Sequence, residues 1–394
     1  MNRRVIGLLS LGHLTVDVYA GVLPVLLYLL RPTLHLSYLM IGVASLLFTI
    51  TSSVIQPIFG YLSDRRHIAE LLPIGCVLCA FGICAASLGP SFPVLLLLIA
   101  VSGCGSALYH PEGAKTAAFF SGDQRASGMS LFSVGGSIGY ACGPGAFLVL
   151  HDVVHGFAPY ALFAFGLIVA VRLAMACAPL RRGVALHLAT RSDVHEPVAW
   201  GVVAAVLGIV AIRGWLHMGL VFFLPYWAGK AGAGLSAGAF VSGFLFAGVV
   251  GTLAAGPLAD RFGPRRVLIL SIAPLTPLLF LFLAVQGIPA LVVIGITGAL
   301  VISSFSITVV MAQQLMTKHQ GMAAGLSNGF ASGIGGLGVL VTGALADHVG
   351  LTASFLTLAV LPLPAIWLAL SLPASVESAL RHVVVEERTL QVAG

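Results

Sequence analysis

The chain has 394 residues, of which 59% are hydrophobic and only 8% are charged, and its mean hydropathy is +1.06. Soluble domains carry about 25% charged residues, so this composition excludes a water-soluble globular fold and indicates a protein that spans a lipid bilayer. The formal net charge of +6 is too small an excess to indicate nucleic-acid binding, and its distribution instead predicts orientation in the membrane.

Clusters of polar, Gly and Pro residues divide the chain into twelve apolar segments. A helix needs about 20 apolar residues to cross about 30 Å of hydrocarbon. The predicted membrane helices cover residues 5–30, 37–61, 69–89, 92–117, 126–150, 157–178, 198–228, 235–258, 266–286, 289–316, 321–346 and 352–373. The first follows Arg3 and Arg4 and has no small-residue cleavage site, so we expect a membrane helix rather than a removed signal peptide.

The first predicted helix carries two ionisable residues on one face. His13 and Asp17 are one helical turn apart. A charge at the bilayer centre costs about 2.5 to 3.5 kcal/mol or more, so intramembrane ionisable residues are functional candidates. The pair can exchange a proton, which predicts a proton-coupling role, and a structural pair that hydrogen-bonds neighbouring helices is the alternative. Tyr19 is a candidate for substrate binding.

The fourth predicted helix contains the stretch "YHPEGAK". Pro111 removes a backbone hydrogen bond and predicts a kink that aims Tyr109, His110 and Glu112 inward. We predict proton coupling by His110 and Glu112 and substrate binding by Tyr109. A purely structural ion pair between Glu112 and Lys115 remains the alternative.

The fifth predicted helix is rich in glycine. Gly139, Gly143 and Pro144 form a Gly-x-x-x-Gly-Pro pattern that resembles the antiporter motif of drug exporters. Small residues at this spacing allow close helix packing, and the proline predicts a bend. We expect these residues to shape the interface on which two halves of the protein move, with ordinary helix packing as the alternative.

The longest polar stretch, residues 179–197, predicts a cytoplasmic linker between a bundle at 1–178 and a second bundle at 198–394. In the second bundle, Arg213 lies near the middle of helix seven, with His217 one turn further on. No acidic residue lies beside Arg213 in the sequence, so it is predicted to grip an anionic substrate or to form a salt bridge between the halves. Trp215 and Gln313 are further candidates for substrate binding.

A repeated motif relates the two predicted bundles. "GYLSDRR" closes helix two and "GPLADRFGPRR" closes helix eight, so Asp64 and Asp260 are 196 residues apart. Two parallel six-helix repeats are typical of secondary transporters. We predict a conformational latch, for which a simple positive-inside loop is the alternative. Its residues are Gly60, Asp64, Arg65, Gly256, Asp260, Arg261 and Arg265.

The distribution of positive charge predicts the orientation of the chain. With the N-terminus inside, the cytoplasmic segments carry 14 of the 19 Lys and Arg residues, whereas the outer loops carry only Arg31 and Lys230. Both termini are therefore predicted to be cytoplasmic.

The repeated loop motif resembles the major facilitator superfamily. The stretches "HLTVD", "SSVIQPIFGYLSD", "LYHPEGAK" and "GMAAGLSNGFASGIGGLG" are similar to the fosmidomycin resistance protein family within it. This resemblance implies an all-α membrane protein with twelve helices in two pseudo-symmetric six-helix bundles, located in the bacterial inner membrane. It also implies proton-driven efflux of a small antibiotic. The family's Ala-Gln-Glu near the end of helix ten is Ala312, Gln313 and Gln314 here, which removes a carboxylate.

The leading functional prediction is a proton-coupled antiporter that exports a small drug-like or anionic compound. An uptake symporter or facilitator for a small organic anion is the alternative, and a non-transporting membrane sensor is a third interpretation. No nucleotide-binding loop, zinc-binding helix or dinucleotide fingerprint is present in the sequence, so we expect no enzymatic activity, cofactor or metal. The predicted partners are a small-molecule substrate, protons and lipid, without nucleic acid, and the chain is predicted to be a monomer.

Overall fold

The computed structural model describes residues 1–56, 58–59, 68–89, 91–121, 125–184, 200–231, 234–315 and 320–372, and these residues form helices joined by short turns. The first half comprises α1 (Arg3–Leu34), α2 (Tyr38–Thr49), the π-helical turn η1 (Ile50–Val54), α4 (Leu71–Ala86), α5 (Phe92–Phe120), α6 (Arg125–Val154), the 3-10 turn η3 (His155–Phe157) and α7 (Ala158–Val184). The second comprises α8 (Trp200–Ala231), α9 (Ala237–Phe262), α10 (Pro264–Ile272), α11 (Leu275–Ala284), α12 (Gly287–Leu315), α13 (Gln320–Val349), α14 (Leu351–Val360) and α15 (Pro362–Ser371).

The helices match the predicted membrane segments closely. Within the described residues, ten spans are long and apolar enough to cross a membrane, and the shorter apolar helices Tyr38–Val54 and Leu71–Ala86 occupy the second and third predicted segments. The ninth and twelfth segments are each broken into two helices, α10 with α11 and α14 with α15. Pro274 and Pro362 lie at these breaks, because proline lacks the N–H that would continue the backbone ladder. The all-α prediction is confirmed.

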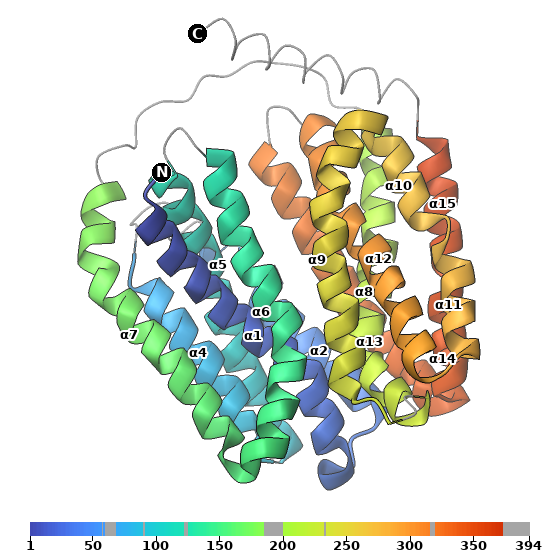
Figure 1. Ribbon diagram of the computed structural model, residues 1–394, viewed down its shortest axis with the longest axis horizontal. Coiled ribbons are helices and arrows are strands. Elements are labelled where there is room, and N and C mark those ends of the chain that lie inside the picture. The colour runs from blue at the N-terminus through green and yellow to red at the C-terminus, as the bar shows by residue number, and fades with distance from the viewer. Residues whose placement is uncertain are drawn as a thin grey trace, which may run out of the picture.

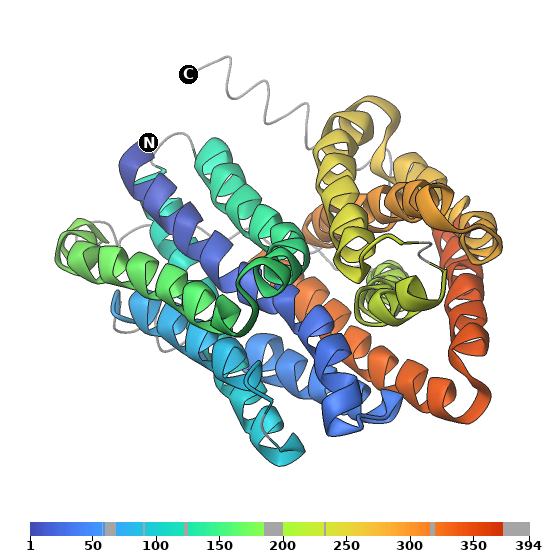
Figure 2. The ribbon, with the colours of Figure 1, turned by 60° about the horizontal axis from the view of Figure 1, so that its bottom comes forward.

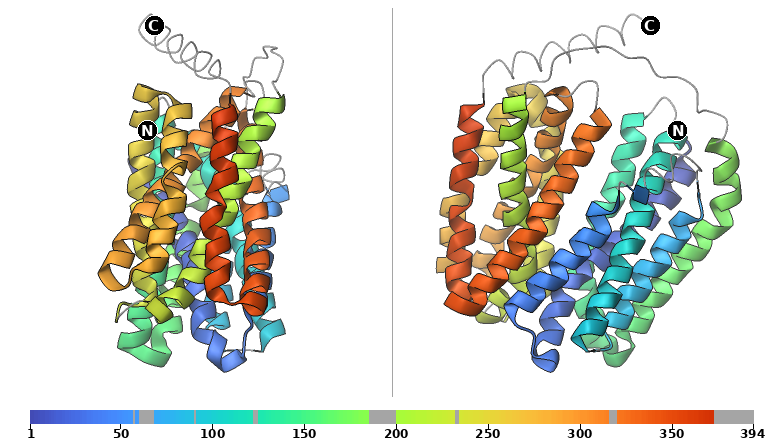
Figure 3. Two further views of the ribbon diagram at one scale, coloured as in Figure 1. Left: turned by 90° about the vertical axis from the view of Figure 1, so that its right-hand side faces the viewer. Right: turned by 180° about the vertical axis from the view of Figure 1, so that it is seen from behind.

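The helices form two groups, α1–α7 and α8–α15, which lie side by side (Figure 1). The groups diverge at the end that holds the N-terminus and the end of α15, and they converge at the opposite end. There α2 lies against α13, and α6 contacts α9 (Figures 2 and 3). The predicted domain boundaries stay a prediction, and residues 185–199 of the linker region lie outside the described residues.

Side-chain caps fix the N-terminal ends of three helices, and a glycine turn separates α9 from α10. Asn2, Ser37 and Ser236 each accept a hydrogen bond from the backbone N–H three residues later, and they cap α1, α2 and α9 respectively. Gly263 separates α9 from α10 with a φ of 91°, a left-handed conformation that a side chain would strain. The second copy of the loop motif therefore contains a sharp turn between two helices.

Small residues bring α6 against α1. A Cβ atom at Gly139 or Gly143 would collide with backbone carbonyl oxygens of α1. Gly145, which follows Pro144, donates its N–H to the hydroxyl of Ser242 on α9, at 3.1 Å. The glycine-rich segment of α6 thus packs tightly within its own half and also contacts the other half through Gly145.

Candidate functional site

A carboxylate lies between two imidazoles and forms with them a close group of three ionisable side chains. The Nε2 atom of His13 lies 3.3 Å from Oδ2 of Asp17, one turn away on α1. The Nε2 atom of His110, on α5, lies 3.2 Å from the other oxygen, Oδ1. The side chains of His13, Asp17 and His110 are 11%, 17% and 24% exposed, so the group is largely buried but not sealed. We call these three residues the His–Asp–His cluster.

Backbone carbonyl groups determine which ring nitrogens of the cluster carry hydrogen. Nδ1 of His13 lies 2.9 Å from the carbonyl oxygen of Phe132 on α6, and Nδ1 of His110 lies 2.8 Å from that of Ser106. A carbonyl oxygen can only accept, so each Nδ1 must donate its N–H. Each Nε2 atom, which lies against Asp17, therefore carries no hydrogen when its imidazole is neutral.

The two contacts with Asp17 are hydrogen bonds only when protons occupy them. A neutral imidazole with hydrogen on Nδ1 presents a lone pair at Nε2, and an ionised carboxylate also presents lone pairs. Two such groups repel, whereas a proton between them creates a charge-assisted hydrogen bond. The geometry therefore fits a protonated cluster, with a place for one proton between Asp17 and each histidine. One possible metal-ligand atom from each of the three residues lies within 4.8 Å of the other two, a spacing that one metal ion could bridge. The expected absence of a metal stays a prediction.

Two neighbours of the cluster were missed by reasoning from the sequence. A Cβ atom at Gly136 would lie 2.5 Å from Nε2 of His13 and 2.6 Å from Oδ2 of Asp17, so α6 can approach only because this residue is glycine. The ring of Phe132 stacks on that of His13 with 4.3 Å between centroids. The signal for Gly136 was its place in a glycine-rich helix, but nothing in the sequence distinguished it from the adjacent glycines.

The second half places Arg213 and His217 against α12. Nη1 of Arg213 donates to the hydroxyls of Ser304 at 3.1 Å and Thr308 at 3.2 Å, and the guanidinium carbon lies 3.6 Å from the centroid of the Phe305 ring. The ring of His217 also contacts Phe305, at 5.3 Å between centroids. The predicted salt bridge to the other half is not formed by the described residues, because Arg213 is held by hydroxyl groups of its own half.

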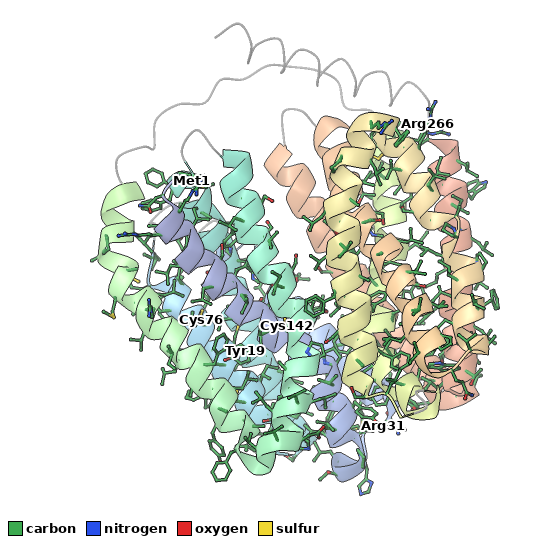
Figure 4. All side chains as sticks on the ribbon, viewed as in Figure 1. Met1, Tyr19, Arg31, Cys76, Cys142 and Arg266 are labelled. Atoms are coloured by element: carbon green, nitrogen blue, oxygen red, sulfur yellow. The ribbon has the colours of Figure 1, made fainter. Side chains whose placement is uncertain are left out.

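The predicted substrate-binding tyrosines use their hydroxyls within the first half. Tyr19 donates to the carbonyl oxygen of Leu162 at 2.8 Å, and Tyr109 donates to that of Leu9 at 2.5 Å. Figure 4 shows Tyr19 among the helices of that half. These bonds tie α1 to α7 and to α5, and a role in substrate binding stays a prediction for both residues.

The remaining intramembrane candidates have different surroundings. Trp215 donates its indole N–H to Thr342 on α13 at 3.0 Å. Glu112 is fully buried and accepts a hydrogen bond from Thr116 at 3.4 Å. The side chain of Gln313 lies outside the described residues.

The predicted latch is described only in its second copy. Residues 60, 64 and 65, which are Gly60, Asp64 and Arg65, lie outside the described residues, as does the side chain of Asp260. Arg265 donates from Nη2 to the carbonyl oxygen of Leu370 on α15 at 2.9 Å, whereas Arg261 and Gly256 are exposed. The latch therefore stays a prediction.

An aromatic cluster joins the two halves at the end where they converge. The ring centroids of Tyr28 and Tyr226 are 5.3 Å apart, and those of Tyr38 and Tyr226 are 5.4 Å apart. The guanidinium carbon of Arg31 lies 4.3 Å from the centroid of the Tyr38 ring. Figure 4 shows Arg31 at the end of the molecule opposite Met1 and Arg266.

Comparison with known proteins identifies the family. The Major Facilitator Superfamily model matches residues 9–245 and 206–390. The chain belongs to the major facilitator superfamily. It is 31% identical to the fosmidomycin resistance protein of Escherichia coli (strain K12), over 91% of the chain and 90% of that protein. It is 30% identical to an uncharacterized MFS-type transporter of Bacillus subtilis (strain 168), over 93% of the chain and 92% of that protein.

Solved structures of the superfamily share the fold. A bacterial homolog of the human lysosomal transporter Spinster, in an inward-facing and occupied conformation, is 15% identical with a TM-score of 0.72, over 93% of this chain and 96% of that one. The nucleoside transporter NupG is 16% identical with a TM-score of 0.69, over 94% and 99%. The predicted major facilitator fold is confirmed, and the chain is a multi-pass membrane transporter rather than an enzyme.

Proposed function

We propose that this major facilitator is a proton-coupled antiporter that exports a small drug-like or anionic solute across a bacterial inner membrane by alternating access. Both termini lie in the cytoplasm in this proposal, as the distribution of Lys and Arg predicts. The observation that carries the proposal is the placement of Asp17 between the Nε2 atoms of His13 and His110. Similarity to the fosmidomycin resistance protein supports export.

The cluster can couple protonation to helix packing because its members lie on different helices. Asp17 contacts α5 through His110, and His13 contacts α6 through the carbonyl of Phe132. Removal of the shared protons leaves facing lone pairs, and the repulsion weakens the contact between α1 and α5. Protonation state thereby favours one arrangement of these helices over another, which is the differential affinity that coupling requires.

With this orientation, the structure corresponds to a carrier closed at its outer end. The contacts between halves that involve Tyr28, Tyr38 and Tyr226 lie at that end, where the helix groups converge (Figure 1). Alternating access would separate these contacts while the cytoplasmic ends approach each other.

Proton–anion symport is the second candidate function, and one observation favours it. Arg213 is a buried cation held by neutral groups of the second half. A protonated cluster in the first half and an anion near Arg213 attract each other, so they would favour joint movement rather than exchange.

The direction of proton flux separates the two candidates. Purified full-length protein would be reconstituted into liposomes that contain a pH-sensitive dye, and fosmidomycin would be added outside as the first solute. Antiport predicts that the lumen becomes alkaline as the solute enters, and symport predicts that it becomes acidic. Solute entry without any change in lumenal pH contradicts proton coupling, and the absence of solute entry for a panel of small anions and drugs contradicts transport of these classes.

Two variants connect the flux to the cluster. Asp17→Asn is expected to abolish the pH change, because the amide cannot take up the proton. Asp152→Asn removes an exposed carboxylate near the end of α6 and is the matched control. An undiminished pH change in Asp17→Asn would place the coupling site elsewhere.

A further inference from the structure

Arg213 and Asp17 occupy equivalent positions in the two sequence repeats. They are 196 residues apart, which is the interval between Asp64 and Asp260. Asp17 on α1 faces His110 on α5, and the residue 196 positions beyond His110 is residue 306 on α12, which lies between the two hydroxyl partners of Arg213. Each half therefore places one charge of α1 or α8 against the corresponding point of its partner helix, and the two charges have opposite sign.

The positive charge of Arg213 is not neutralised in the part of the chain that the structure describes. Its side chain is 3% exposed, it donates to the hydroxyls of Ser304 and Thr308, and its buried Nε atom has no acceptor among the described residues. The hydroxyls of Ser304 and Thr308 donate to backbone carbonyls of α12, so their oxygen lone pairs are directed at the guanidinium. This arrangement holds the guanidinium in place without cancelling its charge, and a buried uncancelled charge is costly.

A second polar atom without a described partner, Nε2 of His217, lies one turn away on the same helix. His217 is 9% exposed, and its buried Nε2 atom has no hydrogen-bond partner within the described part of the chain. Its ring lies between those of Phe244, at 5.8 Å, and Phe305, at 5.3 Å. Two unsatisfied nitrogen groups with aromatic neighbours are thus collected on one face of α8.

We propose that Arg213 and His217 form an oxoanion-binding half-site, which takes the carboxylate, phosphate or phosphonate group of the transported solute. A guanidinium presents N–H groups in a fork that matches two oxygens of such a group, and the imidazole supplies a further donor. Phe244 and Phe305 provide apolar surface beside it. The proposal rests on the proposed transport of a small solute. In it, the first half binds the protons and the second half binds the anion.

The test measures binding, which is independent of proton flux. Isothermal titration of the purified full-length protein would compare phenylphosphonate with its uncharged diethyl ester, and benzoate with benzamide. The wild-type protein is expected to bind the anions and to bind the uncharged partners at least tenfold more weakly. Failure of the wild-type protein to bind either oxoanion, or binding of the diethyl ester and benzamide as tight as that of the anions, overturns the proposal.

Variants assign the binding to this half-site. Arg213→Gln is expected to weaken anion binding by about 30-fold or more, the usual loss when one partner of a buried charged contact is removed. Arg213→Lys keeps the charge without the fork and should show an intermediate loss. Arg172→Gln removes an exposed guanidinium on α7 and should bind like the wild type. Thermal unfolding of each variant identifies any that fails to fold, and His217→Gln then serves as the second test of the same site.

Binding and flux can fail separately. Anion binding that depends on Arg213, in a protein that moves no protons, contradicts the proposed coupling and leaves the half-site intact. Proton-coupled transport that persists in Arg213→Gln with unchanged affinity for the anion contradicts the half-site and leaves the coupling intact.

Discussion

Asp347, near the C-terminal end of α13, accepts hydrogen bonds from the first two backbone N–H groups of α2, in the other half of the protein. Its carboxylate oxygens lie 2.9 Å from the nitrogen of Tyr38 and 2.7 Å from that of Leu39. The third backbone N–H of α2, that of Met40, donates to the hydroxyl of the N-cap residue Ser37 at 3.1 Å. A helix N-terminus carries partial positive charge and unsatisfied donors, so a carboxylate there is favourable. The two halves therefore share one helix cap at the end where they meet.

Asp347→Asn should weaken the contact between α13 and α2, which joins the two halves. The amide lacks the charge that interacts with the helix N-terminus, and the loss is expected to be about 1 kcal/mol. Spin labels at the exposed positions Val43 on α2 and Val341 on α13 would report the separation of these helices. The fraction of molecules with a long label distance should rise several-fold in Asp347→Asn and stay unchanged in Asp152→Asn. An identical distance distribution in all three proteins would show that the cap does not hold the halves together.

Asp17→Asn should separate coupling from binding. We expect this variant to lose proton-driven accumulation of the solute while it keeps solute binding and counterflow exchange, because these need no net movement of protons. Glu112→Gln should reduce proton-driven accumulation as well as solute binding and exchange, since Glu112 is fully buried in α5 and accepts a hydrogen bond from Thr116. Should Asp17→Asn still accumulate solute with full sensitivity to a protonophore, the proton must travel through Glu112 or a histidine.

Gly136→Ala should disrupt the cluster without removing any of its ionisable groups. The added methyl group would lie 2.5 Å from Nε2 of His13 and 2.6 Å from Oδ2 of Asp17, well inside van der Waals contact, so one of these side chains must move. We expect proton-coupled transport to fall at least tenfold. Gly7→Ala is the matched control, because a Cβ at Gly7 has no described atom within 4 Å. Equal transport by the two variants would mean that the observed geometry of the cluster is not needed for coupling.

Tyr109→Phe should affect stability more than binding. The hydroxyl of Tyr109 donates a hydrogen bond to the carbonyl oxygen of Leu9. Its removal is expected to lower the free energy of unfolding by about 1 kcal/mol and to lower the unfolding temperature. Solute affinity should change less than twofold. Tyr160→Phe, at an exposed position of α7, is the control for stability. A large loss of solute affinity in Tyr109→Phe would instead support the substrate-binding role predicted from the sequence.

Several features of this transporter were determined by the sequence itself. Low charge and long apolar runs require a membrane environment, and the repeated loop motif indicates two related halves. The four-residue spacing of His13 and Asp17 places them on one helix face wherever the helix lies. The absence of an acidic neighbour beside Arg213 was also readable, because it depends on local sequence alone.

The tertiary structure decided which distant residues meet these. His110 is 93 residues from Asp17 in the sequence, and its contact depends on how α5 packs against α1. The carbonyls of Phe132 and Ser106, which direct the imidazole hydrogens, belong to the backbone and leave no signal in residue type. The cap that Asp347 supplies to α2 likewise depends on the approach of two halves that are separate in the sequence. Helical periodicity specifies the face of a residue, whereas the partner across that face is specified only when the helices pack.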